Sequence, residues 1–277
     1  MKKEVKNITR STKKEVKKAT VKKAVAKKKN ITGKSVKNGQ TKKQKLSIVV
    51  PVYNEKDLVI DVLKKVRSLK IKDTDIEVIV VDDKSTDGTT QILKKEGNKY
   101  ADKVLFHEIN MGKGAGLRTG FKETTGDVVI VQDADFEYDC EEIPSVVEPI
   151  FKGECDVCYG SRFLNKEYKG YKQNQLANRI LTGLSNFMTG LKVTDMETCY
   201  KAFKGDLIRS VNIKENRFGF EPEITAKVSK RKVKLVEVPI HYYPRTKEEG
   251  KKIKLKDGFR ALWCITKYKF AKEKKNK

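Results

Sequence analysis

Apolar positions follow two alternating patterns along most of the chain. Continuous runs rich in β-branched residues at 46–52, 76–83 and 127–135 are typical of strands buried on both faces, and 103–108 has a similar composition. Between the first two runs, apolar residues recur at helical spacing over 58–69. Strands that alternate with helices predict βαβ units, and therefore an α/β fold with a mostly parallel sheet flanked by helices.

The second half of the chain has a less regular pattern. Apolar residues at helical spacing over 176–191 predict a helix face that packs into the core, with a membrane-dipping surface as the alternative. Residues 233–244 are expected to be extended and 256–270 to form a terminal helix. No internal repeat and no linker rich in Pro, Gly or Ser interrupts the pattern. We therefore expect a single domain over residues 46–270.

Positive charge is concentrated at the start of the chain. The whole chain has a net charge of +25, and residues 1–45 contain 18 Lys and Arg against two Glu, which gives +16 and leaves +9 for the rest. This segment has no aromatic residue and only isolated apolar ones, so it cannot bury enough apolar surface to offset the entropy of ordering. We predict a disordered Lys-rich arm over 1–45, and a short basic tail over 271–277.

Several classes of protein are disfavoured by composition. No apolar run approaches the roughly 18–20 residues of a membrane-spanning helix, and the first ten residues lack the apolar segment of a secretory signal. Two His and five scattered Cys argue against a zinc enzyme or a His-based charge relay. We expect a cytoplasmic protein with reduced cysteines.

Polar side chains follow three of the predicted strands, at 53–55, 82–83 and 133–135. In parallel sheets ligands bind beyond the carboxyl ends of the strands. Asp133 and Asp135 are two apart in an extended segment, so both carboxylates can point at one place, and a hard divalent cation would relieve their repulsion. Glu137 continues the series as a third oxygen ligand. Because Mg²⁺ and Mn²⁺ keep coordination sites for substrate phosphates, the pattern predicts a metal-bound diphosphate.

Eight motifs occur in order along this predicted domain, namely VVPVYNE (49–55), VVDDKSTDGT (80–89), NMGKGAGLRTG (110–120), QDADFEYD (132–139), GSRF (160–163), DMETCYKAF (195–203), RFGFEPEI (217–224) and EVPIHYYPR (237–245). Together they resemble a family 2 glycosyltransferase of the dolichyl-phosphate mannose synthase and polyprenyl-phosphate sugar transferase branch, over about residues 46–265. The resemblance implies a GT-A (Rossmann-like) fold. It also implies inverting transfer of one sugar from a nucleotide-diphosphate sugar, of the GDP-mannose or UDP-glucose type, to a polyprenyl or dolichyl phosphate, with Mg²⁺ or Mn²⁺ as cofactor.

The resemblance also implies roles for individual residues. Donor binding is expected of Pro51, Tyr53, Glu55, Asp83, Asp133, Ala134, Arg245 and Lys251. Acceptor binding is expected of Ser161, Arg162 and Arg179. The metal is expected on Asp133, Asp135 and Glu137, and the catalytic groups are expected to be Asp135, Arg162, Arg245, Asp195 and Glu197.

The acceptor is left open by departures from the family pattern. The synthases usually have Ser-Gly or Thr-Gly where this chain has Thr198-Cys199, and Arg where it has Lys201. A phosphate acceptor is already anionic and needs only positioning by Arg, whereas a hydroxyl acceptor needs a carboxylate base, for which Asp195 and Glu197 are the candidates. A saccharide or protein acceptor therefore remains an alternative, and so does a non-catalytic protein tethered to nucleic acid.

A lipid acceptor affects the interpretation of the arm over 1–45. Polybasic segments adhere to anionic leaflets, with about 1 kcal/mol for each Lys near the surface. We therefore expect the arm to bind an anionic membrane surface rather than nucleic acid. The enzyme would then lie at the cytosolic face of a membrane.

Overall fold

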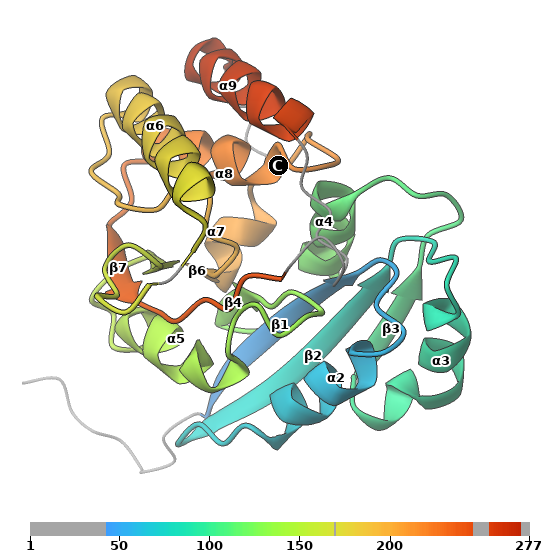
Figure 1. The fold of residues 1–277 in the computed structure, drawn as a ribbon. Helices are drawn as coiled ribbons and strands as arrows, with labels where there is room; N and C mark the ends of the chain where they lie inside the picture. The colour runs from blue at the N-terminus through green and yellow to red at the C-terminus, as the bar shows by residue number, and fades with distance from the viewer. Residues whose placement is uncertain (1–42, 169, 246–254, 273–277) are drawn as a thin grey trace, which may run out of the picture. The chain divides into compact units, whose positions relative to one another are not determined.

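Seven strands of the described chain form one mixed sheet at the centre of the fold, in the order β3-β2-β1-β4-β6-β5-β7 (Figure 1). A computed structural model describes residues 43–168, 170–245 and 255–272. The strands are β1 (Gln44–Val52), β2 (Thr74–Asp82), β3 (Lys103–Phe106), β4 (Val128–Val131), β5 (Val157–Ser161), β6 (Lys201–Lys204) and β7 (Leu235–Pro239). β1 pairs in parallel with β2 and β4, β2 with β3, and β5 with β7, while β6 runs antiparallel to β4 and β5. The predicted α/β class with a mostly parallel sheet is confirmed.

Helices cover both faces of this sheet. They are α2 (Val59–Ser68), α3 (Thr89–Glu96), α4 (Lys113–Glu123), α5 (Ile143–Phe151), α6 (Lys172–Thr189), α7 (Gly205–Arg209), α8 (Phe220–Lys230) and α9 (Leu255–Phe270), with short 3₁₀ helices η1 (Gly97–Lys99) and η2 (Cys140–Glu142). Residues of α2, α3 and α5 share one core cluster, and residues of α4, α6, α8 and α9 share another. Figure 1 shows α2, α3 and α5 on one side of the sheet and α4, α6, α8 and α9 on the other.

The continuous apolar runs are explained by burial on both faces. In β1, Ile48 and Val50 belong to the cluster with α2, whereas Val49 between them belongs to the cluster with α4. All three side chains are fully buried. Because successive side chains of a strand point to opposite faces, a strand between two helical layers must be apolar at every position.

The predicted core face over 176–191 was wrong in part. Leu181 is buried and Leu184 is partly buried against the core, as expected. Leu176, Ile180 and Phe187 lie instead on the opposite, exposed side of α6. Apolar residues therefore occupy two sides of this helix, and periodicity alone does not identify the side that faces the core.

Several predicted segments extend beyond the described residues. Of the arm over 1–45 only the last three residues are described, and β1 begins at Gln44, two residues before the predicted domain. Only the first two residues of the tail over 271–277 are described, and Lys251 lies outside the described residues. Within the part of the chain that the structure describes, no helix has both the length and the apolarity needed to cross a membrane.

Candidate active site

The carboxyl ends of β1, β2 and β4 lie beside one another, because these strands are parallel neighbours. Tyr53 and Glu55 follow β1, and Asp83 follows β2. Asp133 and Asp135 follow β4. The fold therefore gathers the polar side chains that the sequence placed after three separate strands.

Arg245 brings two of these strand ends together. Its Nη2 donates to Asp135 Oδ2 at 2.6 Å, and its Nη1 and Nη2 donate to the two oxygens of Glu55 at 3.1 and 3.2 Å. Its Nε is buried and has no hydrogen-bond partner among the described residues. A bidentate pair fixes the guanidinium plane, and the remaining N–H is a donor that suits an anionic ligand.

Asp133 is paired with Lys113, the first residue of α4. Lys113 Nζ lies 2.8 Å from Asp133 Oδ1 and 3.0 Å from its Oδ2, and 3.5 Å from Oε1 of Glu221. Burial lowers the pKa of Lys113, but the charges of Asp133 and its other neighbours outweigh burial and raise that pKa well above its ordinary value. Lys113 is a site residue that the sequence analysis did not single out, although it lies in the motif NMGKGAGLRTG (110–120).

The electrostatics of Asp135 fit a cation site. Burial and then the nearby Asp133 carboxylate raise the pKa of Asp135 to about 7, although Arg245 acts to lower it. A divalent cation would relieve this cost, since it prefers carboxylate oxygens and neutralises their charge. Asp133 and Asp135 together therefore offer an oxygen donor set that Mg²⁺ or Mn²⁺ accepts.

Glu137 has a different environment from the one predicted. Its Oε1 accepts the backbone N–H of Arg245 at 3.0 Å, and its Oε2 accepts the Tyr242 hydroxyl at 3.2 Å. No group of three His, Cys, Asp or Glu suited to a metal occurs among the described residues. In this structure the Glu137 carboxylate positions the segment that contains Arg245, and its role as a third metal ligand stays a prediction.

The Asp83 carboxylate also has a structural role, because it binds the loop over residues 110–112. Its carboxylate accepts the backbone N–H groups of Met111 and Gly112 at 2.9 and 2.5 Å and the side-chain amide of Asn110 at 2.9 Å, and a ring nitrogen of His107 lies at 2.7 Å. The side chain is almost fully buried. These contacts differ from the predicted contact with the base or ribose, and they anchor the loop that leads to α4 and Lys113.

The remaining predicted donor residues surround the same strand ends. Pro51 lies in β1 and is half-buried, as is Tyr53. Ala134 is buried between the two aspartates in sequence. α4 packs closely over β1, since a Cβ added at Gly120 would lie 2.4 Å from Cγ1 of Val49, and Gly116 of the same helix lies over Pro51.

Arg162 and Asp195 form a buried ion pair. Arg162 Nε and Nη2 donate to the two Asp195 oxygens at 2.7 and 2.8 Å, and the Arg162 backbone N–H donates to Asp195 at 3.1 Å. Their side chains are 7% and 0% exposed, and the guanidinium lies 5.1 Å from the centre of the Tyr242 ring. The contacts differ from the predicted ones, because both Asp195 oxygens are engaged by Arg162 and the Arg162 guanidinium faces Asp195. The roles of Asp195 as a base and of Arg162 at an acceptor phosphate stay predictions.

The other predicted acceptor residues lie apart. Ser161 is fully buried, and its hydroxyl is 2.6 Å from that of Thr194, so it closes a turn and is not placed to contact an acceptor. Arg179 is exposed on α6, with its guanidinium 5.2 Å from the centre of the Phe163 ring. Of the predicted acceptor-binding residues, Arg179 alone is exposed.

Glu197 is the better placed of the two candidate bases. Its Oε1 is buried and has no hydrogen-bond partner among the described residues. Burial and the neighbouring Glu221 raise the pKa of Glu197 to about 8, while Lys201 acts to lower it. Glu221 in turn approaches Lys113, so Glu197 belongs to the charge network that reaches Asp133. A carboxyl with a pKa near neutrality is suited to proton transfer.

Comparisons with known proteins agree on one family. The family model described as "Glycosyl transferase family 2" matches residues 47–211. A dolichol-phosphate mannosyltransferase from Pyrococcus furiosus is 27% identical over 211 residues, which are 75% of this chain and 59% of that protein. An undecaprenyl-phosphate 4-deoxy-4-formamido-L-arabinose transferase from Edwardsiella ictaluri is 28% identical over 211 residues, 75% of this chain and 63% of that protein. The matched part thus spans about three fifths of these two relatives.

A solved structure supports the architecture. Glucosyl-3-phosphoglycerate synthase from Mycobacterium tuberculosis, in complex with Mn²⁺, uridine diphosphate and glucosyl-3-phosphoglycerate, superposes with a TM-score of 0.64 at 20% identity. The superposition covers 85% of this chain and 86% of that one. The predicted GT-A arrangement is confirmed by this shared fold.

Proposed function

The chain belongs to glycosyl transferase family 2, and from this premise we propose that it transfers one sugar, with inversion, from a nucleotide-diphosphate sugar to a polyprenyl phosphate. An oxygen of the acceptor phosphate forms the new bond to the anomeric carbon. The bond from that carbon to the donor diphosphate breaks, and the nucleoside diphosphate leaves. The names of two relatives, a dolichol-phosphate mannosyltransferase and an undecaprenyl-phosphate sugar transferase, support this acceptor class.

The donor half of the proposal depends on one observation, the paired charges at the strand ends. Asp133 lies against Lys113, and Asp135 lies against Arg245. Asp133 and Asp135 would hold Mg²⁺ or Mn²⁺, which supplies positive charge at the donor diphosphate. Lys113 and Arg245 would then release a carboxylate and bind diphosphate oxygens. The Nε of Arg245, which has no hydrogen-bond partner within the described part of the chain, is a donor available for this contact. These cations stabilise the negative charge that grows on the leaving group.

Glu55 supports Arg245 in this role. The Glu55 carboxylate accepts hydrogen bonds from both terminal nitrogens of the guanidinium, so Arg245 would stay oriented if Asp135 bound a metal ion instead. The backbone of the same segment is fixed by Glu137. A positioned Arg gives directional hydrogen bonds to phosphate, in addition to charge.

A hydroxyl acceptor is the second candidate, and Glu197 is the observation in its favour. The Oε1 of Glu197 lacks a partner among the described residues, and burial raises the pKa of this carboxyl to about 8. A saccharide hydroxyl must lose its proton during transfer, and a general base of this kind contributes roughly 10²–10⁴-fold. A phosphate acceptor has no proton to lose at neutral pH.

One experiment separates the two candidates. The purified chain and its Glu197→Gln variant would be incubated with Mn²⁺ and a panel of nucleotide sugars. Each donor would be offered with a polyprenyl phosphate in detergent and, separately, with saccharides. We expect a lipid-linked sugar, formed by Glu197→Gln within a few-fold of the wild-type rate. A saccharide product whose rate falls by about 10²-fold or more in Glu197→Gln would favour the second candidate, and no product with any donor would overturn both.

A further inference from the structure

Six large apolar side chains form two exposed rows on neighbouring helices. Leu176, Ile180 and Phe187 lie along α6, and Phe259, Trp263 and Phe270 lie along α9. Their exposed fractions run from 48% to 82%. We call these six residues the α6–α9 surface.

Each row lies directly opposite the buried side of its helix. The three residues of each row follow one another at intervals of four and seven, which places them within about 40° on a helix of 3.6 residues per turn. In α6 the buried positions are Leu181, Thr182 and Ser185, and in α9 they include Cys264 and Tyr268, all roughly a third to half a turn away from the rows. The two helices pack against each other, as Figure 1 shows, so both rows point away from the core.

Exposed apolar residues in rows are unusual on a protein surface. Single exposed apolar side chains are ordinary, whereas a contiguous patch marks an interaction surface. α6 and α9 also lie in the same core cluster, so the exposed rows are not needed to attach them to the fold. The exposed rows of the α6–α9 surface are therefore suited to an interaction with a partner.

The charges beside the rows identify the partner. α6 contains Lys172 and Arg179 and no acidic residue, and α9 contains four basic residues against Asp257. The charged groups of Arg260 and Lys267 lie 4.4 and 4.2 Å from the centre of the Trp263 ring, and both form ion pairs with Glu215, at 2.5 and 2.9 Å. Lys172, Arg179 and Lys269 add positive charge to the two helices beside this paired group. A helix with Trp, Phe and Leu on one side and Lys and Arg beside them is the pattern of helices that lie in the interface of an anionic bilayer.

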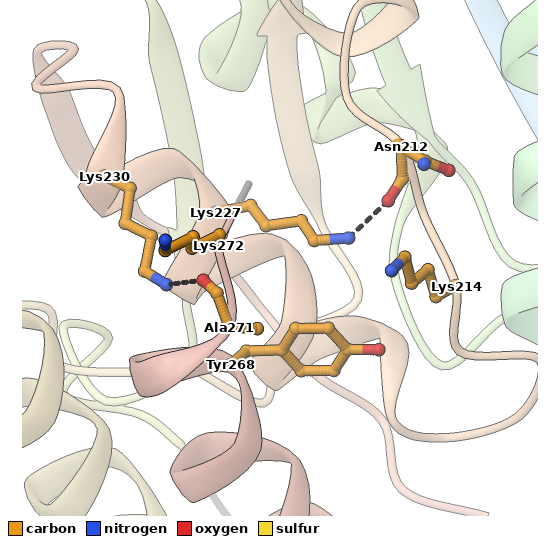
Figure 2. A pocket seen from close by; sticks show the side chains of 7 residues that line it. All are labelled: Asn212, Lys214, Lys227, Lys230, Tyr268, Ala271 and Lys272. Atoms are coloured by element: carbon orange, nitrogen blue, oxygen red, sulfur yellow. Dashed lines mark hydrogen bonds between the residues drawn. The ribbon is translucent and has the colours of Figure 1, made fainter. Parts of the chain in front are cut away.

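A basic hollow lies at the end of α9, between α8 and α9 (Figure 2). It is lined by Asn212, Lys214, Lys227, Lys230, Tyr268, Ala271 and Lys272. Lys227 and Lys230 donate to the backbone carbonyls of Asn212 and Ala271. Lys227 is buried and also paired with Glu223, so the positive charge that the hollow adds beside the end of α9 comes from Lys214, Lys230 and Lys272.

We propose that the α6–α9 surface docks on an anionic lipid bilayer, with the six apolar side chains entering the acyl boundary and the flanking Lys and Arg side chains contacting lipid phosphates. This inference goes beyond the proposed function, because it stands whether the acceptor is a lipid phosphate or a saccharide. It differs from adhesion of the Lys-rich arm over 1–45, which is purely electrostatic and would not bury an apolar side chain.

Trp263 makes the test direct, because it is the single Trp of the chain and lies in the α6–α9 surface. The full chain would be mixed with vesicles of phosphatidylcholine containing 30% phosphatidylglycerol, and the Trp fluorescence would be recorded. We expect a blue shift and strong quenching by lipids brominated on the acyl chains. The binding should persist at 0.5 M salt, where purely electrostatic adhesion is screened.

Substitutions test whether vesicle binding depends on the α6–α9 surface. Replacing Leu176, Ile180 and Phe187 together with Ser should weaken vesicle binding at 0.5 M salt at least tenfold, while the far-ultraviolet circular dichroism stays unchanged. Ile109→Ser is the matched control, since Ile109 is equally exposed but lies outside α6 and α9. Binding without a blue shift or quenching of wild-type Trp263 would overturn the proposal. So would a dimer, detected by sedimentation without lipid, that the triple Ser variant dissociates while vesicle binding is unaffected.

Discussion

The buried pair between Arg162 and Asp195 yields a sharp prediction about a residue that sequence reasoning placed in catalysis. Asp195→Asn removes the negative charge and keeps the size of the side chain. It leaves the Arg162 guanidinium 7% exposed without a counter-charge, and with an acceptor for only one of its two side-chain hydrogen bonds to this residue. The expected effect is therefore on folding, and activity should fall only as far as folding does.

The magnitude follows from burial and geometry. Removing one partner of a buried ion pair costs about 3–5 kcal/mol, because the other charge stays buried without compensation. Both Asp195 oxygens are used at 2.7 and 2.8 Å and the partners are 7% and 0% exposed, so no solvent screening reduces this figure. For a domain of this size a change of 1 kcal/mol shifts Tm by about 2–4 °C, so we expect a loss of about 6–20 °C.

Urea unfolding followed by circular dichroism measures this effect, with Asp206→Asn as control. Asp206 forms an ion pair with Arg209 at 2.6 Å, but its side chain is fully exposed, so the same substitution should cost less than about 1 kcal/mol. An Asp195→Asn protein with unchanged unfolding free energy and a turnover reduced a hundredfold would refute this reasoning. That result would return Asp195 to the role of a base.

Three further predictions concern other buried groups. The pKa of Glu197 is raised from 4.5 to about 8 by burial and then by a nearby carboxylate, so the native state holds a proton that the unfolded state has lost, and wild-type stability should fall as the pH rises from about 4.5 to about 8. Glu197→Gln should flatten that decline in pH-dependent urea unfolding. Despite burial, hydrogen bonds lower the pKa of Glu215 to about 2, so its contribution to folding stability is present above pH 4.5 and is lost as the pH falls toward 2. Glu215→Gln should therefore cost about 1–3 kcal/mol of stability at pH 7 and reduce the acid sensitivity of thermal unfolding. Gly114→Ala would place a Cβ 2.3 Å from the Glu215 carbonyl oxygen and should destabilise the protein by about 1–3 kcal/mol in calorimetry. In the same helix Gly116→Ala meets only an ordinary contact at 3.6 Å and should be neutral or slightly stabilising; equal losses for the two glycine variants would contradict the packing described for α4.

The sheet and the strand-end carboxylates were predictable because they depend on local patterns. Runs buried on both faces identify the central parallel strands, and their carboxyl ends must meet at one edge. Asp133 and Asp135 could therefore be placed at one site from sequence alone. Arg245 is 110 residues further along the chain than Asp135, and it was assigned only through the resemblance of its motif to a known family.

The partners of these groups were not predictable, because they depend on tertiary contacts. Lys113 follows a glycine in a turn motif, and nothing local indicates that its ammonium is buried against Asp133. Asp195 and Arg162 are 33 residues apart, and their pairing appears only when β5 is placed in the sheet. The two-sided apolar pattern of α6 has the same cause, since the position of the core is set by neighbouring elements and not by the helix itself.

The most direct test of the central claim is metal-dependent donor binding by calorimetry. The wild-type chain and Asp135→Asn would be titrated with a panel of nucleotide sugars, with and without Mn²⁺, alongside Asp206→Asn as control. We predict Mn²⁺-dependent binding for the wild type and the control, and an affinity at least about tenfold weaker for Asp135→Asn. Equal Mn²⁺-dependent affinity for Asp135→Asn and the wild type would contradict the placement of the donor diphosphate at Asp133, Asp135 and Arg245.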